Sequence, residues 1–213
     1  MIHFHILSAF PESFSSYFSQ SLIKRAIEKK IIKVSIYDLR AFASDKRKSI
    51  DGRPYGGGPG MVLLAEPIIK AIKKIKGRKK NFKIIVTSAG GKTFSNELAE
   101  KWKGEFKHIL IICGHYEGID ARLTKIFKAQ EISIGPYILT GGELPALVMV
   151  DVITRRLEGV LGKEESVEEK RIASHEVYTR PEIIEYQGKK YKVPKVLLSG
   201  HHKKIDAWRK KKS

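Results

Sequence analysis

Short apolar runs alternate with amphipathic segments along most of the chain. The apolar runs predict β-strands over residues 2–7, 32–37, 84–87, 109–112 and 131–134. Helical spacing of the apolar positions predicts helices over residues 12–19, 21–30, 66–75, 95–102, 119–127 and 145–160. Strands that alternate with helices indicate an α/β fold, with a mostly parallel sheet and helices on both of its faces.

Three glycine-bearing loops follow three of the predicted strands: residues 88–91, 113–120 and 133–145. The carboxyl ends of strands in an open α/β sheet share one edge, so these loops are expected to meet there. The third loop holds three glycines and two prolines, and backbone groups exposed by glycine can bind a flat ligand. We expect this loop to form the floor of a ligand site.

Two familiar phosphate motifs are absent. Gly91-Lys92-Thr93 resembles the end of a P-loop, but Val86 stands where the first glycine of that motif is required. No G-x-G-x-x-G follows a predicted strand, which disfavours a dinucleotide site, and no His/Cys spacing indicates zinc.

A fourth glycine-rich loop spans residues 51–61 and contains five glycines. A planar base could lie against its backbone, with Asp51 accepting a hydrogen bond from a guanine edge and Arg53 contacting phosphate or base. A plain flexible connection is the alternative.

The formal net charge of the 213 residues is +18, which favours a polyanionic partner such as RNA or DNA; general solubility is the alternative. Residues 70–80 hold seven basic side chains and no acid, and residues 189–213 hold ten basic side chains and one acid. Two separate basic clusters suit an extended phosphate backbone.

The single cysteine, Cys113, excludes an internal disulfide framework and follows an apolar run typical of a buried strand. The first residues lack the pattern of a signal peptide, and no apolar run reaches the length of a membrane span. These features predict a cytoplasmic protein.

Seven motifs in this order resemble the bacterial tRNA (guanine-N1)-methyltransferase family, and together they cover essentially the whole chain. They are residues 53–61 (RPYGGGPGM), 113–120 (CGHYEGID), 133–135 (SIG), 139–145 (LTGGELP), 159–162 (GVLG), 178–182 (YTRPE) and 197–201 (LLSGH).

The resemblance implies a knotted (trefoil) α/β methyltransferase of the SPOUT class that works as a homodimer with its active site at the subunit interface. It implies methyl transfer from S-adenosylmethionine to N1 of the guanosine immediately 3′ of a tRNA anticodon, which supports reading-frame maintenance. The family also requires magnesium, so Mg²⁺ is a candidate cofactor, with ligands that the sequence does not identify. The implied organisation is a methyltransferase domain over residues 1–161, a linker over 162–174 and a short, truncated, helical, basic tRNA-binding region over 175–213.

Individual residues carry over by their place in the motifs. The cofactor-binding positions are Ser88, Gly114, Tyr116, Glu117, Gly118, Ser133, Ile134, Gly135, Tyr137, Leu139, Gly141, Gly142 and Pro145. The positions expected to contact guanine or tRNA are Asp51, Arg53, Tyr55, Gly57, Gly58, Pro59 and Gly60. Arg155, in the helix that follows Pro145, matches a family arginine that neutralises charge on guanine O6.

The general base is the clearest departure from the family pattern. N1 of guanine must lose a proton to become nucleophilic, and the family uses an aspartate of the linker for this step. Lys170 stands at that position here, so we expect Glu169 to act as the base, with Glu168 as the second candidate. A relative that kept the cofactor pocket but lost the base, and only binds RNA, is the alternative.

Overall fold

The computed structural model describes residues 1–161 and 176–211. The chain divides into two compact units, Met1–Leu161 and Gly162–Ser213. The linker glutamates Glu168 and Glu169 lie outside the described residues, as does Lys170. No helix in the described ranges is long and apolar enough to cross a membrane.

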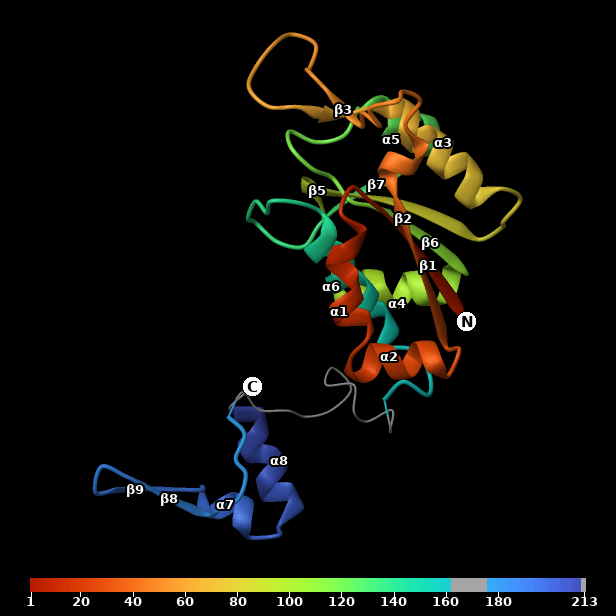
Figure 1. Ribbon diagram of the computed structural model, residues 1–213. Helices are drawn as coiled ribbons and strands as arrows, with labels where there is room; N and C mark the ends of the chain where they lie inside the picture. Colours follow the sequence, from red (N-terminus) through yellow and green to blue (C-terminus); the bar gives the residue numbers. More distant parts are fainter. Residues whose placement is uncertain (162–175, 212–213) are drawn as a thin grey trace. The chain divides into compact units, whose positions relative to one another are not determined.

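A five-stranded sheet forms the centre of the first unit (Figure 1). Its strands pair in parallel throughout, in the order β2-β1-β6-β5-β7. They are β1 (Ile2–Ser8), β2 (Ile32–Asp38), β5 (Phe82–Thr93), β6 (His108–Ile112) and β7 (Gln130–Ser133). The predicted α/β fold with a parallel sheet is confirmed.

Side chains alternate between the two faces of the sheet, as the period of a strand requires. On β5, Ile85 joins one apolar core while its neighbours Ile84 and Val86 join the other. The first core is covered by α1 (Ser15–Phe18), α2 (Ser21–Glu28), α4 (Asn96–Glu105) and α6 (Glu143–Thr154). The second is covered by the 3₁₀ turn η2 (Leu39–Phe42), α3 (Ala65–Lys76) and α5 (Arg122–Phe127). Helices therefore cover both faces, as expected (Figure 1).

Several element ends differ from the sequence-based expectation. The helix predicted over residues 12–19 begins as a 3₁₀ turn, η1 (Pro11–Phe14), before α1. Helix α6 ends at Thr154, six residues before the predicted end, because the chain turns through i→i+3 bonds and reaches Gly159 at a φ of +79°. Strand β5 continues past the predicted end to Thr93, since its last residues pair with β7 after a bulge.

Residues 176–211 of the second unit form two helices, α7 (Lys195–Leu198) and α8 (His202–Lys211), and a β-hairpin that the helical expectation did not include. The hairpin joins β8 (Ile183–Tyr186) to β9 (Lys189–Lys192) through Gln187 and Gly188. Both turn residues have positive φ, at 50° and 73°, which is the geometry that two-residue hairpin turns require.

Candidate functional site

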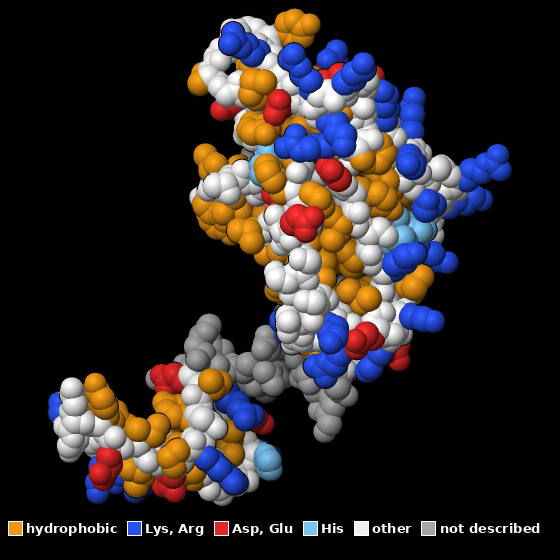
Figure 2. All heavy atoms as spheres, viewed as in Figure 1, with side chains coloured by type: hydrophobic (Ala, Val, Ile, Leu, Met, Phe, Trp, Pro, Cys, Tyr) orange, Lys and Arg blue, Asp and Glu red, His pale blue; other side chains and the backbone are white. Residues whose placement is uncertain are grey.

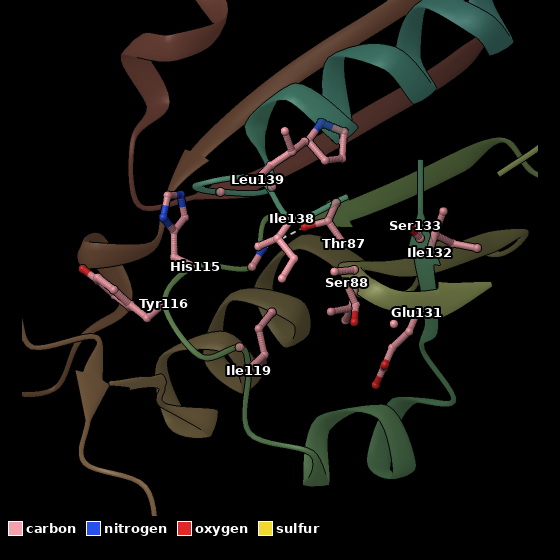
Figure 3. Close-up of a pocket in the computed structure, with 18 of the residues that line it drawn as sticks. Thr87, Ser88, His115, Tyr116, Ile119, Glu131, Ile132, Ser133, Ile138 and Leu139 are labelled. Carbon is pink, nitrogen blue, oxygen red and sulfur yellow. Dashed lines mark hydrogen bonds between the residues drawn. The ribbon is translucent and has the colours of Figure 1, made fainter. Parts of the chain in front are cut away.

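A cavity of about 500 Å³ lies at the carboxyl ends of β6 and β7 and beside residues 86–90 of β5, where the three glycine-bearing segments meet (Figure 3). This size suits a nucleoside-sized ligand. Twelve of the thirteen residues that the sequence nominated for cofactor binding line it: Ser88, Gly114, Tyr116, Glu117, Gly118, Ser133, Ile134, Tyr137, Leu139, Gly141, Gly142 and Pro145. Gly135 does not line the cavity; it packs against the ring of Tyr137, with no room for a Cβ atom.

Close backbone packing holds the loops of the cavity together. Thr87 Oγ1 accepts a hydrogen bond of 2.8 Å from the Gly114 N–H, shown as a dashed line in Figure 3. A Cβ atom on Gly142 would clash with Thr87 and would lie 2.7 Å from both Cys113 Cα and Gly114 N. The segment that enters α6 therefore passes the end of β6 at a distance that only glycine allows.

A buried polar network behind this wall was missed by the sequence reasoning. Glu143, with 9% of its surface exposed, accepts a hydrogen bond of 2.6 Å from Ser8 Oγ and lies 2.7 Å from His115 Nε2. The Phe10 ring packs on His115 at 4.8 Å between centroids. This network fixes the 113–120 loop to β1 and to the start of α6. Gly142 and Glu143 belong to the 139–145 motif, but the neighbouring sequence does not indicate that Glu143 contacts Ser8 and His115.

Apolar side chains that were not nominated form much of the remaining wall. Figure 3 shows Ile119, Ile132 and Ile138 around the cavity, each from a different loop or strand. Their contribution suits a ligand with a flat apolar surface.

The glycine-rich loop 51–61 is tied to the cavity through Glu117. The loop is closed by a short ribbon, β3 (Asp51–Gly52) with β4 (Val62–Leu63). Glu117 N–H donates to the Met61 carbonyl at 3.0 Å, and a Cβ atom on Gly60 would lie 2.6 Å from Glu117 Oε1. Tyr116 lies beside Asp51: the pKa of Tyr116 is raised mainly by burial and, second, by its hydrogen bond to the Asp51 carboxylate. The nominated guanine loop and the nominated cofactor loop are therefore in direct contact.

The nominated tRNA-contact residues beyond Asp51 are mostly exposed. Arg53, Gly57, Gly58 and Gly60 border a second hollow together with Pro54 and Met61. Tyr55 projects fully into solvent, and Pro59 is exposed beside it.

Arg155 does not line the cavity of its own chain. It caps the carboxyl end of α6, whereas Pro145, near the amino end of that helix, is part of the cavity wall. Ten residues of helix separate them, which corresponds to about 15 Å at 1.5 Å per residue. The structure does not bring Arg155 together with the other nominated residues of the same chain.

Comparison with known proteins identifies the family of the chain. The family model described as tRNA (Guanine-1)-methyltransferase TrmD matches residues 2–213. A protein of Clostridioides difficile named tRNA (guanine-N(1)-)-methyltransferase is 45% identical over 100% of this chain and 92% of its own length. Proteins with the same name from Mycoplasma mycoides and Carboxydothermus hydrogenoformans are 45% and 46% identical, over 97% and 98% of this chain and 84% and 81% of their own lengths. The chain belongs to the tRNA (guanine-1)-methyltransferase TrmD family.

Proposed function

We propose that this protein transfers a methyl group from S-adenosylmethionine to N1 of the guanosine immediately 3′ of a tRNA anticodon. The observation that carries the proposal is the convergence of twelve nominated cofactor residues on one cavity, with the nominated guanine loop in contact with it. Family membership over the whole chain supports the same reaction.

The cavity fits the methyl donor in both size and chemistry. Tight packing at Gly114 and Gly142 keeps side chains out of the passage between the loops and leaves backbone groups to face an adenine ring. Bound S-adenosylmethionine would supply an activated methyl group on a sulfonium centre. Residues 133–142 would hold the adenosine part, and Tyr116 and Glu117 would lie on the side that faces the guanine loop.

Side chains of the protein would act on the guanine in three ways. Asp51, beside Tyr116, would accept hydrogen bonds from the edge of the base. Glu169, or in its place Glu168, would remove the N1 proton, because N1 is a poor nucleophile while it carries that proton. Arg155 would neutralise the negative charge that then develops on O6. The proposal extends to Mg²⁺, but the described residues bring together no group of three acidic side chains for it, and no step is assigned to it.

A homodimer is part of the proposal because Arg155 and the cavity lie at opposite ends of α6 in one chain. In a twofold dimer, Arg155 of one subunit would serve the cavity of the other. Exposed apolar side chains support such an interface: Leu144 and Val148 on α6 are 58% and 40% exposed. Figure 2 shows hydrophobic side chains gathered on the loop that leads into α6, and Ile138 is among the exposed ones. Contiguous apolar patches of this kind mark interaction surfaces.

The trefoil knot of the SPOUT class also belongs to the proposal. The close passage of Gly142 against Cys113 and Gly114, together with the bridge between His115 and Gly141, supports a chain threaded tightly at the end of β6. The basic residues 70–80 and the basic second unit would bind the tRNA backbone electrostatically. Cytoplasmic location follows from the proposed tRNA substrate.

The experiment that tests this function measures transfer of labelled methyl from S-adenosylmethionine to tRNA transcripts. We expect incorporation into a transcript with G immediately 3′ of the anticodon and none into the matched transcript with A there. No incorporation at any magnesium concentration, with tRNA binding retained, would instead indicate a non-catalytic RNA-binding protein.

A further inference from the structure

Three of the seven histidines of the chain meet near the amino ends of the neighbouring strands β1 and β6, away from the cavity. His3 and His5 lie on β1 and, two residues apart, point to the same face of the sheet. His108 is the first residue of β6 and pairs with His3 in the parallel register. One nitrogen from each ring lies within 4.8 Å of one nitrogen from each of the others.

We propose that His3, His5 and His108 form a binding site for a divalent transition-metal ion, of which Zn²⁺ is the best fit, through three neutral imidazole nitrogens. Nothing in the proposed methyl transfer uses these residues. His3 and His108 stand at the amino ends of β1 and β6, whereas the cavity lies beyond the carboxyl ends of β6 and β7. The ion would therefore bind at a site separate from the active centre.

The distances suit a zinc ion after a small adjustment of the side chains. His5 Nε2 and His108 Nδ1 are 3.3 Å apart, close to the roughly 3.3–3.4 Å that two ligands subtend in a tetrahedral site with Zn–N bonds of about 2.0–2.1 Å. The His3 ring lies over the His5 ring at 3.8 Å between centroids, so rotation of His3 would bring its nitrogen to the same ion. Three protein ligands leave a fourth position for water.

Hydroxyl groups already bond one ring nitrogen of His5 and one of His3. Tyr37 Oη lies 3.0 Å from His5 Nδ1, and Ser35 Oγ lies 2.9 Å from His3 Nε2. Ligand histidines usually engage a hydrogen-bond partner with the second ring nitrogen, which fixes the tautomer and orients the ring. The rings of His5 and His108 also stack on Phe82, which limits their movement.

The three imidazole rings and the lysines near them favour a transition-metal ion over Mg²⁺ or Ca²⁺. His5 is 1% exposed, and burial favours the neutral form of an imidazole, which is the form that binds a metal ion. Lys33 and Lys79 lie close enough to interact electrostatically with His3 and His5, and their charge opposes a dication. Only an ion that bonds strongly to imidazole would overcome this repulsion; Mg²⁺ and Ca²⁺ prefer oxygen ligands. Figure 2 shows histidine side chains at the surface with Lys and Arg side chains beside them.

The test is a zinc titration of the chelator-treated, redialysed full-length protein at neutral pH, with a chromophoric chelator as competitor. We expect one tightly bound Zn²⁺ per chain, with a Kd in the micromolar range or below and no displacement by Mg²⁺. His3→Gln and His108→Gln, at half-exposed positions, are each expected to weaken binding by at least about tenfold. His202→Gln, at an exposed position in the second unit, is the matched control and is expected to leave binding unchanged.

A second measurement keeps the proposal testable if these variants fold poorly. Anomalous diffraction from wild-type crystals grown with zinc is expected to place the ion between the three rings. Absence of stoichiometric zinc binding, zinc located elsewhere, or equal affinity in folded His3→Gln, His108→Gln and His202→Gln proteins would overturn the proposal.

Discussion

Gly60 lies so close to Glu117 that a Cβ atom on Gly60 would come within 2.6 Å of the carboxylate oxygen Oε1. This contact joins the glycine-rich loop 51–61 to the loop that lines the cavity, although the two residues are 57 positions apart in the sequence. The proposed guanine-binding and cofactor-binding parts of the site therefore touch at this point.

Gly60→Ala is predicted to impair methyl transfer through this contact. The new methyl group would displace Glu117, and we expect kcat/KM for tRNA to fall by at least about tenfold, which corresponds to about 1.4 kcal/mol. Gly56→Ala is the matched control, because Gly56 has nearly the same φ (+85° against +83°) but no atom within 4 Å of the added Cβ. Equal losses in the two variants would show that backbone strain, and not the contact with Glu117, is responsible.

Gly142→Ala is predicted to close the passage between the cofactor loops. Its φ of −83° is ordinary, so the effect would come from the collision of the Cβ atom with Thr87 and with the backbone at Cys113 and Gly114. We expect affinity for S-adenosylmethionine, measured by calorimetry on folded protein, to fall by more than about tenfold, or 1.4 kcal/mol. Gly90→Ala, which lines the same cavity with open space around its Cβ, is expected to change the affinity far less. Wild-type affinity in Gly142→Ala would contradict the geometry.

Arg155 is predicted to act on the cavity of the partner subunit. Heterodimers of Arg155→Ala chains with Ser88→Trp chains, whose cavity the indole would fill, have one complete site when Arg155 works across the interface. Their rate, measured on heterodimers purified through two different tags, should be roughly half that of the wild type.

The reciprocal heterodimer separates the two arrangements. A chain that carries both substitutions, paired with a wild-type chain, should be inactive if Arg155 serves the partner and half-active if it serves its own cavity. Activity in this second heterodimer, with none in the first, would remove the reason for an active site shared between subunits.

Glu169→Gln is predicted to lower the single-turnover methyl-transfer rate at least about tenfold, because the amide cannot accept the N1 proton of guanine. Affinity for S-adenosylmethionine should remain nearly unchanged, as the residue is proposed to act on guanine and not on the cofactor. Glu168→Gln, the same substitution at the preceding residue, is the matched control variant. A rate loss in Glu168→Gln alone would assign the base to that residue.

Local sequence patterns predicted the five strands, most of the helices and the convergence of three glycine loops, because hydrophobic period and strand direction largely determine these features. They did not predict the Ser8–Glu143–His115 network, since Ser8 and Glu143 are 135 residues apart and meet only in the folded chain. The early end of α6 and the hairpin at Gln187-Gly188 were also missed. Both depend on turn geometry that short apolar patterns do not encode.

The position of the transferred methyl group is the most direct test of the central claim. After reaction of the wild-type protein with S-adenosylmethionine and a tRNA transcript carrying G 3′ of the anticodon, nuclease digestion and mass spectrometry should yield 1-methylguanosine from that position alone. The same reaction with the Ser88→Trp protein should yield none. A methyl group on another base or another atom of guanine, or equal product from the protein with the filled cavity, would contradict the proposed reaction at this site.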